Sequence, residues 1–172
     1  MKRNILFGAL AGTLAIIAAA ALPADKTKSE ETFDRLASLQ GEWRGQINGI
    51  NTVLIYTLTA NGSALMEQCR PDKGPEMITM FTVDGDHLLA THYCSAKNQP
   101  QMATSPIADV HKPLAFSLVR VSGLKSPDDF HNTALKVIQE DDDHLTQEWS
   151  YEHKHKSSKN SFRFTRVRQG AN

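Results

Sequence analysis

The sequence predicts an all-β protein: a single closed antiparallel β-barrel of about 8–10 strands, with a short N-terminal helix. Beyond residue 40, the chain reads as short segments of alternating apolar and polar residues, separated by turn residues. One stretch ahead of these segments has apolar residues at helical spacing. An open sheet of so many strands would expose its edges, and closure into a barrel removes them.

The first 24 residues are predicted to be a cleaved signal peptide, which leaves residues 25–172 as one barrel domain. Lys2 and Arg3 precede an apolar run over residues 5–21, and small residues follow at which a signal peptidase could cut. The run is also long enough to cross a membrane, so an uncleaved anchor is the alternative. Cleavage predicts an exported protein, periplasmic or secreted, that has no further membrane contact.

The charge balance limits the classes of partner. The chain has 19 basic and 19 acidic residues, and loss of Lys2 and Arg3 leaves 17 basic against 19 acidic. A nucleic-acid partner would require a basic face, so none is expected. The composition leaves the oligomeric state open.

The two cysteines, Cys69 and Cys94, would meet an oxidising environment after export, where a disulfide could form. Each is predicted to end a strand, with one strand between them. Next-nearest strands lie roughly 9–10 Å apart, which is beyond the usual reach of a disulfide. Two buried thiols are therefore the alternative to a bridge.

Residues 29–39 predict the helix. Phe33, Leu36 and Leu39 recur at helical spacing and form one apolar stripe. Ser29 is expected to cap the helix at its N-terminus.

The remaining chain predicts about ten strands. Asn61-Gly62 is a strong signal for a tight hairpin between the second and third of them. The strands are expected at residues 42–47, 52–60, 63–69, 76–83, 87–94, 101–104, 114–121, 131–140, 144–152 and 161–167.

The stretch 87–94 contains histidine, tyrosine and cysteine side chains that can take part in chemistry or binding. His92 is the leading candidate among them for a functional site. A histidine can change charge near neutral pH, share hydrogen bonds or bind a metal. His92 shares one strand face with Leu88, Ala90 and Cys94, whose small members leave room for a ligand. The opposite face is equally apolar, so the inward direction stays open, as does the plain role of a core histidine.

Glu67 and Cys94 could act together with His92. Glu67 shares a strand face with Leu65 and Cys69, and a carboxylate on an inward face needs a partner or a proton. A Glu67–His92 pair could serve as a general acid–base couple. Cys94 lies two residues from His92 and could be a nucleophile, although no third group is evident to orient the histidine. The alternative for Glu67 is that it faces solvent.

Strand alternation adds three ligand-binding candidates. Gln147 and Trp149 alternate with polar residues on the face assigned inward in strand 144–152. His131 is assigned inward in strand 131–140 by the same argument. Polar atoms among aromatic rings are the usual composition of a small-molecule pocket. Gln147 could equally tie strands together.

Asn98 and Gln99 are candidates for the mouth of the barrel, in a predicted loop that ends with Pro100. Their amides could bind a ligand or cap backbone groups of a tight turn. No metal site is predicted, because lysines flank the His153-x-His155 pair and the acidic turn at 141–143 lacks the spacing of a calcium loop.

The motif Gly41-Glu42-Trp43 resembles the Gly-x-Trp signature that opens lipocalin-like (calycin) barrels. In such barrels a short helix plugs one end, and an arginine from a late strand lies against the tryptophan. The resemblance implies that Arg166 or Arg168 makes this cation–π contact. Helix, motif, strands and arginine follow one another in the expected order.

A second resemblance covers most of the chain after the signal segment. The chain is similar to a bacterial family of small lipocalin-like proteins, exported or cytoplasmic, whose function is uncharacterised. It departs from the family at Gln101, where a basic residue is usual, and at Thr133, where a second histidine often occurs. The motifs that carry the resemblance are Thr91-His92-Tyr93-Cys94, Asn98-Gln99-Pro100, Met102, Leu124-Lys125-Ser126-Pro127, His131 and Thr146-Gln147-Glu148-Trp149.

The function expected from these features is binding of a small, partly apolar ligand inside the barrel. An enzyme that uses His92 with Glu67 or Cys94 for acid–base chemistry is one alternative. Haem binding through His92 or His131 is another, implied by the haem carriers among calycin barrels. A filled barrel that serves only as an interaction module is the last. The cofactor, if any, stays unknown, and the sequence leans away from an enzyme.

Overall fold

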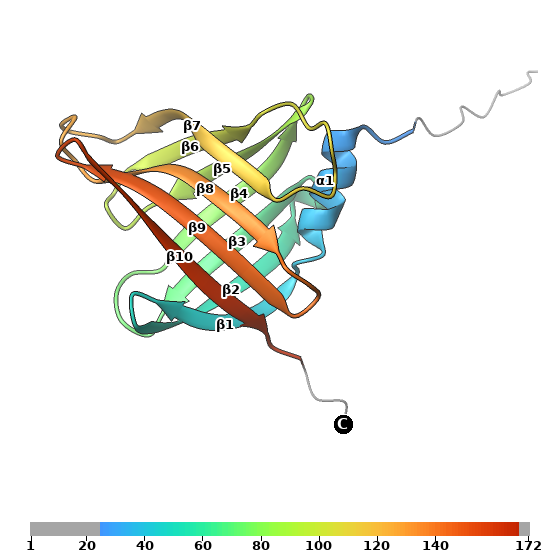
Figure 1. The fold of residues 1–172 in the computed structure, drawn as a ribbon, viewed down its shortest axis with the longest axis horizontal. Helices are drawn as coiled ribbons and strands as arrows, with labels where there is room; N and C mark the ends of the chain where they lie inside the picture. The colour runs from blue at the N-terminus through green and yellow to red at the C-terminus, as the bar shows by residue number, and fades with distance from the viewer. Residues whose placement is uncertain (1–24, 169–172) are drawn as a thin grey trace, which may run out of the picture.

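Ten antiparallel strands close into one barrel, as the alternation of the sequence predicts (Figure 1). The computed structural model describes residues 25–168, so the predicted signal segment 1–24 lies outside the described residues. Each strand pairs with its neighbours in the chain, and β1 pairs with β10 to complete the ring. The strands are β1 (Gly41–Ile47), β2 (Ile50–Thr59), β3 (Ala64–Pro71), β4 (Met77–Asp84), β5 (His87–Tyr93), β6 (Gln99–Thr104), β7 (Leu114–Ser122), β8 (His131–Gln139), β9 (His144–His153) and β10 (Lys156–Arg166).

The period-2 pattern of burial follows the sequence closely. In β5 the residues Leu88, Ala90 and His92 are buried, while Tyr93 is about half exposed. The buried apolar side chains of all strands form one continuous core inside the ring. Side chains alternate between the two faces of a strand, so this pattern places every second residue inside the barrel.

The turn between β2 and β3 differs from the predicted two-residue hairpin. Ala60–Gly62 form a short 3-10 turn, and Ala60, Asn61 and Gly62 have φ angles of 50°, 53° and 86°. Asn and Gly tolerate this left-handed region better than other residues. The Asn-Gly pair therefore marks the turn correctly, but the turn also takes Ala60 and Ser63 from the two predicted strands.

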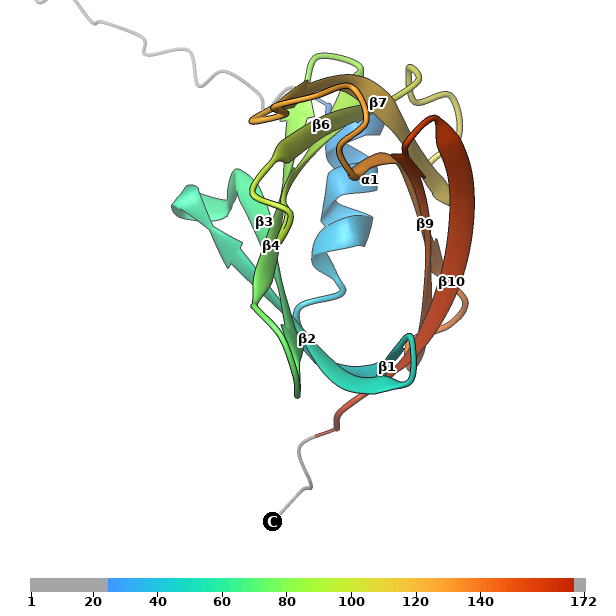
Figure 2. The same cartoon turned by 90° about the vertical axis from the view of Figure 1, so that its left-hand side faces the viewer.

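The helix α1 (Lys28–Ala37) lies at one end of the barrel, as Figures 1 and 2 show. Its N-cap is Thr27 and not Ser29: the Thr27 side chain accepts from the backbone N–H of Glu30, whose carboxylate accepts from the Thr27 N–H. Ser29 is instead buried, and its hydroxyl donates to the Gly85 carbonyl oxygen at 2.6 Å. The predicted apolar stripe, which includes Phe33, is buried against the barrel.

Barrel closure depends on a close approach of β1 to β10. The two strands pair through three residues on each side, among them Gly45 opposite Phe164. A Cβ atom at Gly45 would lie 2.3 Å from the Arg163 carbonyl oxygen, a distance that no side chain tolerates. Glycine at this position is thus a condition for closing the ring.

Arg166 joins the helix end of the barrel to the closing strand. Its guanidinium lies 4.2 Å from the centre of the Trp43 ring, so it is the arginine of the expected cation–π contact. The same group donates to the carbonyl oxygens of Ser38, Gln40 and Asp142, at 3.0, 2.8 and 2.7 Å. The Trp43 indole N–H in turn donates to Leu39 O at 2.8 Å. Four segments of the chain therefore meet at this one side chain.

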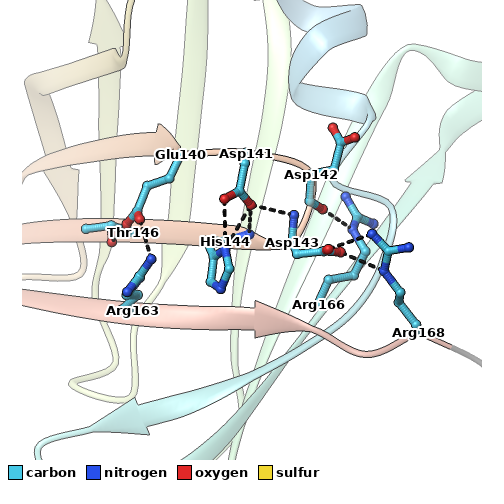
Figure 3. A network of polar contacts seen from close by, with 9 residues as sticks. All are labelled: Glu140, Asp141, Asp142, Asp143, His144, Thr146, Arg163, Arg166 and Arg168. Atoms are coloured by element: carbon cyan, nitrogen blue, oxygen red, sulfur yellow. Dashed lines mark hydrogen bonds and ion pairs between the residues drawn. The ribbon is translucent and has the colours of Figure 1, made fainter.

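The acidic turn between β8 and β9 has a structural role (Figure 3). Asp141 accepts hydrogen bonds from the backbone N–H groups of Asp143 and His144 at 2.8 and 2.7 Å. Asp143 pairs with Arg168, the other candidate for the tryptophan contact. The turn thus holds the end of β10 through the Asp143–Arg168 ion pair and the hydrogen bond from the Arg166 N–H to the Asp143 carbonyl oxygen.

Both cysteines are free, so the predicted alternative of a Cys69–Cys94 disulfide is wrong for this structure. Burial raises the pKa of the Cys69 thiol to about 12, which keeps it protonated and unreactive at neutral pH. Within residues 25–168, no helix is long and apolar enough to cross a membrane.

We predict that Arg166→Lys lowers the free energy of unfolding by about 2 kcal/mol, because an ammonium cannot reach three carbonyl oxygens and the Trp43 ring together. Urea unfolding followed by far-UV circular dichroism measures the loss. Arg163→Lys is the matched control on the same strand, since Arg163 only pairs with Glu140 at the surface. Equal losses in the two variants would contradict the role of Arg166.

Candidate functional site

A cavity of about 320 Å³ lies at the end of the barrel opposite α1. It is bounded by the β1–β2 turn, the end of β5 and the strand ends next to the β7–β8 and β9–β10 connections. Aromatic and sulfur-containing side chains alternate there with polar ones. The lining consists of Ile47, Asn48, Glu67, Cys69, Met77, His92, Cys94, Ser95, Phe130, Asn132, Gln147, Trp149, Tyr151, Asn160 and Phe162.

The cavity brings together most of the residues that the sequence singles out. Five of the predicted ligand-binding residues line it, namely Glu67, His92, Cys94, Gln147 and Trp149. The other three, Asn98, Gln99 and His131, lie outside the lining. A ligand-binding role for the five stays a prediction, and the geometry shows what they could do.

His92 points into the barrel, which answers the question that strand alternation left open. It is 4% exposed, and its Nδ1 shares a 2.9 Å hydrogen bond with the Thr79 hydroxyl. Its ring packs against Trp149 with 4.8 Å between the ring centres. Burial lowers the pKa of His92 to about 4, so the imidazole is neutral at physiological pH. A neutral ring in the cavity wall offers one donor or acceptor without a charge.

Glu67 also points inward and is 2% exposed, so the solvent-facing alternative is wrong. Its Oε2 accepts from the Tyr56 hydroxyl and from Gln147 Nε2, each at 2.5 Å. Gln147 also accepts from the Trp149 indole N–H at 3.0 Å. Burial raises the pKa of Glu67 to about 7, although the hydrogen bonds from Tyr56 and Gln147 oppose the shift. The carboxyl group can therefore lose or gain a proton near neutral pH.

The expected Glu67–His92 pair is not formed. Glu67 bonds to Tyr56 and Gln147, whereas His92 bonds to Thr79. The reason is the register: Glu67 and His92 both lie opposite Thr79, on the two sides of β4, so one residue stands between them in the sheet. The two titratable groups share the cavity wall but hold separate hydrogen-bond partners.

A bulge in β8 changes which residue of that strand faces the cavity. The register with β9 shifts between Asn132 and Ala134, so Asn132 takes the inward place expected for His131. His131 is buried outside the lining, and its Nδ1 lies 2.9 Å from the Asp129 carbonyl oxygen. Thr133 is the additional residue. His131 therefore does not line the cavity, contrary to the prediction from strand alternation.

Asn98 and Gln99 support the loop and do not line the cavity. Asn98 is buried, and its Nδ2 donates to the carbonyl oxygen of Phe130 at 2.6 Å, next to the cavity wall. Gln99 and Pro100 belong to β6 rather than to a loop, and Gln99 Oε1 accepts from Ser122 Oγ at 3.0 Å. The backbone-capping alternative thus describes Asn98, which positions Phe130.

The site also contains three residues that were not predicted from the sequence, namely Tyr56, Asn132 and Asn160. Tyr56 lies on the same face of β2 as Leu54 and Leu58, so strand alternation could have predicted that it points inward. Asn132 depends on the bulge, for which the sequence has no clear signal. Asn160 lies where β10 extends beyond its predicted start at residue 161.

The donor set does not favour a metal or haem. Among residues 25–168, no group of three or more His, Cys, Asp or Glu side chains could hold a metal ion. For haem, His92 is the only histidine in the lining that the described residues form, and none of their lysines or arginines lines the cavity to pair with propionates. The negative charge that Glu67 can carry would oppose them. The described residues do not fit this group.

Comparison with models of known protein families and with curated proteins shows no match to this chain. The resemblance to lipocalin-like barrels therefore rests on the closed ten-stranded barrel, the N-terminal helix and the Trp43–Arg166 contact.

We predict that Glu67 and His92 impose opposite pH slopes on stability. The pKa of Glu67 is raised from 4.5 to about 7, so its contribution to stability is lost as pH rises through that interval. The pKa of His92 is lowered from 6.5 to about 4, so its contribution is lost as pH falls through that interval. Between pH 5 and 6.5 the two slopes largely cancel in the native protein.

Single variants should reveal each slope. In Glu67→Gln, the free energy of unfolding should rise by about 1–2 kcal/mol from pH 5 to 6.5, and in His92→Gln it should fall by a similar amount. Urea unfolding at several pH values measures both. The same pH profile in all three proteins would show that the two side chains are not buried as described.

Proposed function

We propose that the protein binds a small, partly apolar molecule in the open end of the barrel. The observation that carries the proposal is the cavity itself, where a buried carboxyl group and a neutral imidazole stand among aromatic side chains. Pockets for small molecules combine apolar walls with a few fixed polar groups. The helix α1 seals the opposite end, so a ligand would enter past the β1–β2 and β9–β10 turns.

The polar groups of the wall are held before any ligand arrives. Gln147 connects Trp149 to Glu67, and Tyr56 bonds to both Gln147 and Glu67. Thr79 fixes the ring of His92 from the other side. A site that is organised in advance loses less entropy on binding, which favours a binding role.

Export and family membership are parts of the same proposal. The predicted signal peptide at residues 1–24 supports a periplasmic or secreted protein. The barrel, its helix and its closing arginine support membership of the lipocalin-like proteins, many of which enclose ligands.

An acid–base enzyme is the second candidate, because Glu67 has a pKa of about 7 inside a cavity. The geometry supports it less well. His92 and Glu67 do not bond to each other, and the pKa of His92 lies near 4. Cys94 has no hydrogen bond to His92 within the described residues. Binding requires none of these contacts.

The test uses N-phenyl-1-naphthylamine, a neutral probe that fluoresces in apolar surroundings. The native protein should enhance its fluorescence with saturation, and Asn160→Trp should abolish or strongly reduce binding, because the larger side chain fills the cavity. Ser161→Trp is the matched control, since Ser161 is the next residue of β10 and is exposed on the outer face. It should bind like the native protein.

Lack of binding by the native protein, or equal binding by both variants, would contradict an internal site. Native mass spectrometry of protein from its own host provides an independent check: a copurified small molecule should be present in the native protein and in Ser161→Trp, and absent from Asn160→Trp.

A further inference from the structure

The cavity contains a potential negative charge that has no positive partner in the part of the chain that the structure describes. Glu67 is buried, and both of its hydrogen-bond donors, Tyr56 and Gln147, are neutral groups. Within residues 25–168, no lysine or arginine belongs to the lining. An ionised carboxylate in such surroundings is unfavourable unless a cation reaches it.

The carboxyl group keeps an oxygen available to a ligand. Both hydrogen bonds from the barrel reach Oε2, and Oε1 has none from the described residues. Because Glu67 lines the cavity, this oxygen is the natural contact for a hydrogen-bond donor. A ligand ammonium group would supply both the donor and the missing positive charge.

The walls around the carboxyl group also suit a cation with an apolar body. Phe130 and Tyr151 pack with 5.0 Å between ring centres, and Trp149 and Phe162 complete the aromatic lining. The faces of aromatic rings attract cations and cover apolar groups equally well. An anionic ligand, in contrast, would meet Glu67 and no positive side chain from the described residues.

We propose that the ligand is a small organic monocation, an ammonium group on an apolar body, whose nitrogen binds the Glu67 carboxylate among the aromatic side chains. This inference rests on the proposed function, because it assigns a ligand class to the same cavity.

The binding of such a cation should depend on pH through Glu67. The titratable groups that touch Glu67 or line the cavity are Tyr56, Cys69, His92, Cys94 and Tyr151. Burial raises the pKa of Tyr56 and Cys69 and lowers that of His92, so these three stay neutral near pH 7. The cation should bind the ionised form of Glu67, and affinity should rise between pH 5.5 and 7.5.

Isothermal titration calorimetry with three matched probes tests the inference: 2-(1-naphthyl)ethylamine, the corresponding neutral alcohol and 1-naphthylacetate. At pH 7.5 the amine should bind at least about tenfold more tightly than the alcohol, because a charge-assisted hydrogen bond replaces a neutral one. The carboxylate should bind most weakly. At pH 7, amine binding should release protons, which appears as a dependence of the binding enthalpy on the buffer.

Glu67→Gln should remove the advantage of the amine over the alcohol and its pH dependence. The variant keeps an oxygen that can accept from Tyr56, and near-UV circular dichroism checks its fold. Glu148→Gln is the matched control: it loses the same charge on the next position of β9 after Gln147, where Glu148 pairs with Lys159 outside the cavity. It should keep the preference of the native protein.

The outcomes separate the two proposals. If the alcohol binds as tightly as the amine, or if the amine keeps its advantage in Glu67→Gln, the inference is overturned while the cavity remains a binding site. If the amine does not bind but N-phenyl-1-naphthylamine does, the result is the same. If none of the four probes binds, the proposed function fails as well. The native protein alone decides the comparison of probes, even if Glu67→Gln does not fold.

Discussion

The contact between Arg166 and Trp43 is the interaction on which the rest of this barrel depends. β1 and β10 pair through only three residues on each side, a short seam for a ring of ten strands. Arg166 reinforces the seam by stacking on Trp43 and by binding carbonyl oxygens from the segment after α1 and from the β8–β9 turn. The same side chain thus closes the ring and attaches the segment that follows the helix.

Closing one end of the barrel divides its interior into two parts. Near α1, side chains such as Phe33, Leu36 and Trp43 are buried and belong to the apolar core. Towards the other end, Tyr56, Glu67 and Gln147 replace apolar residues and bond to one another. Buried polar groups are favourable only when their hydrogen bonds are satisfied, so this network is also what keeps a polar cavity compatible with a stable barrel.

Much of the fold could be predicted because strand alternation is a local property. The ten strands and the inward direction of Gln147 followed from the spacing of the residues. The resemblance to lipocalin-like barrels implied the arginine contact with Trp43 and left Arg166 and Arg168 as candidates, of which the structure shows Arg166. The pocket was harder to predict in detail. The prediction that His131 faces the pocket was wrong, because a bulge around Thr133 reverses the alternation of β8. Asn98 does not line the cavity but donates a hydrogen bond to the backbone of Phe130. Bulges and loop contacts depend on neighbouring strands, which a single strand does not reveal.

The chain's own pattern predicts one helix, the strands of a barrel and a few polar residues among them, because periodicity acts between residues close in sequence. The partners of those polar groups depend on which strands become neighbours. Glu67 meets Gln147, eighty residues away, and not His92, although each is opposite Thr79. The three-dimensional arrangement alone makes Glu67 a buried carboxyl group with no cationic side chain beside it among residues 25–168, since charge balance inside a barrel is set by contacts across the ring.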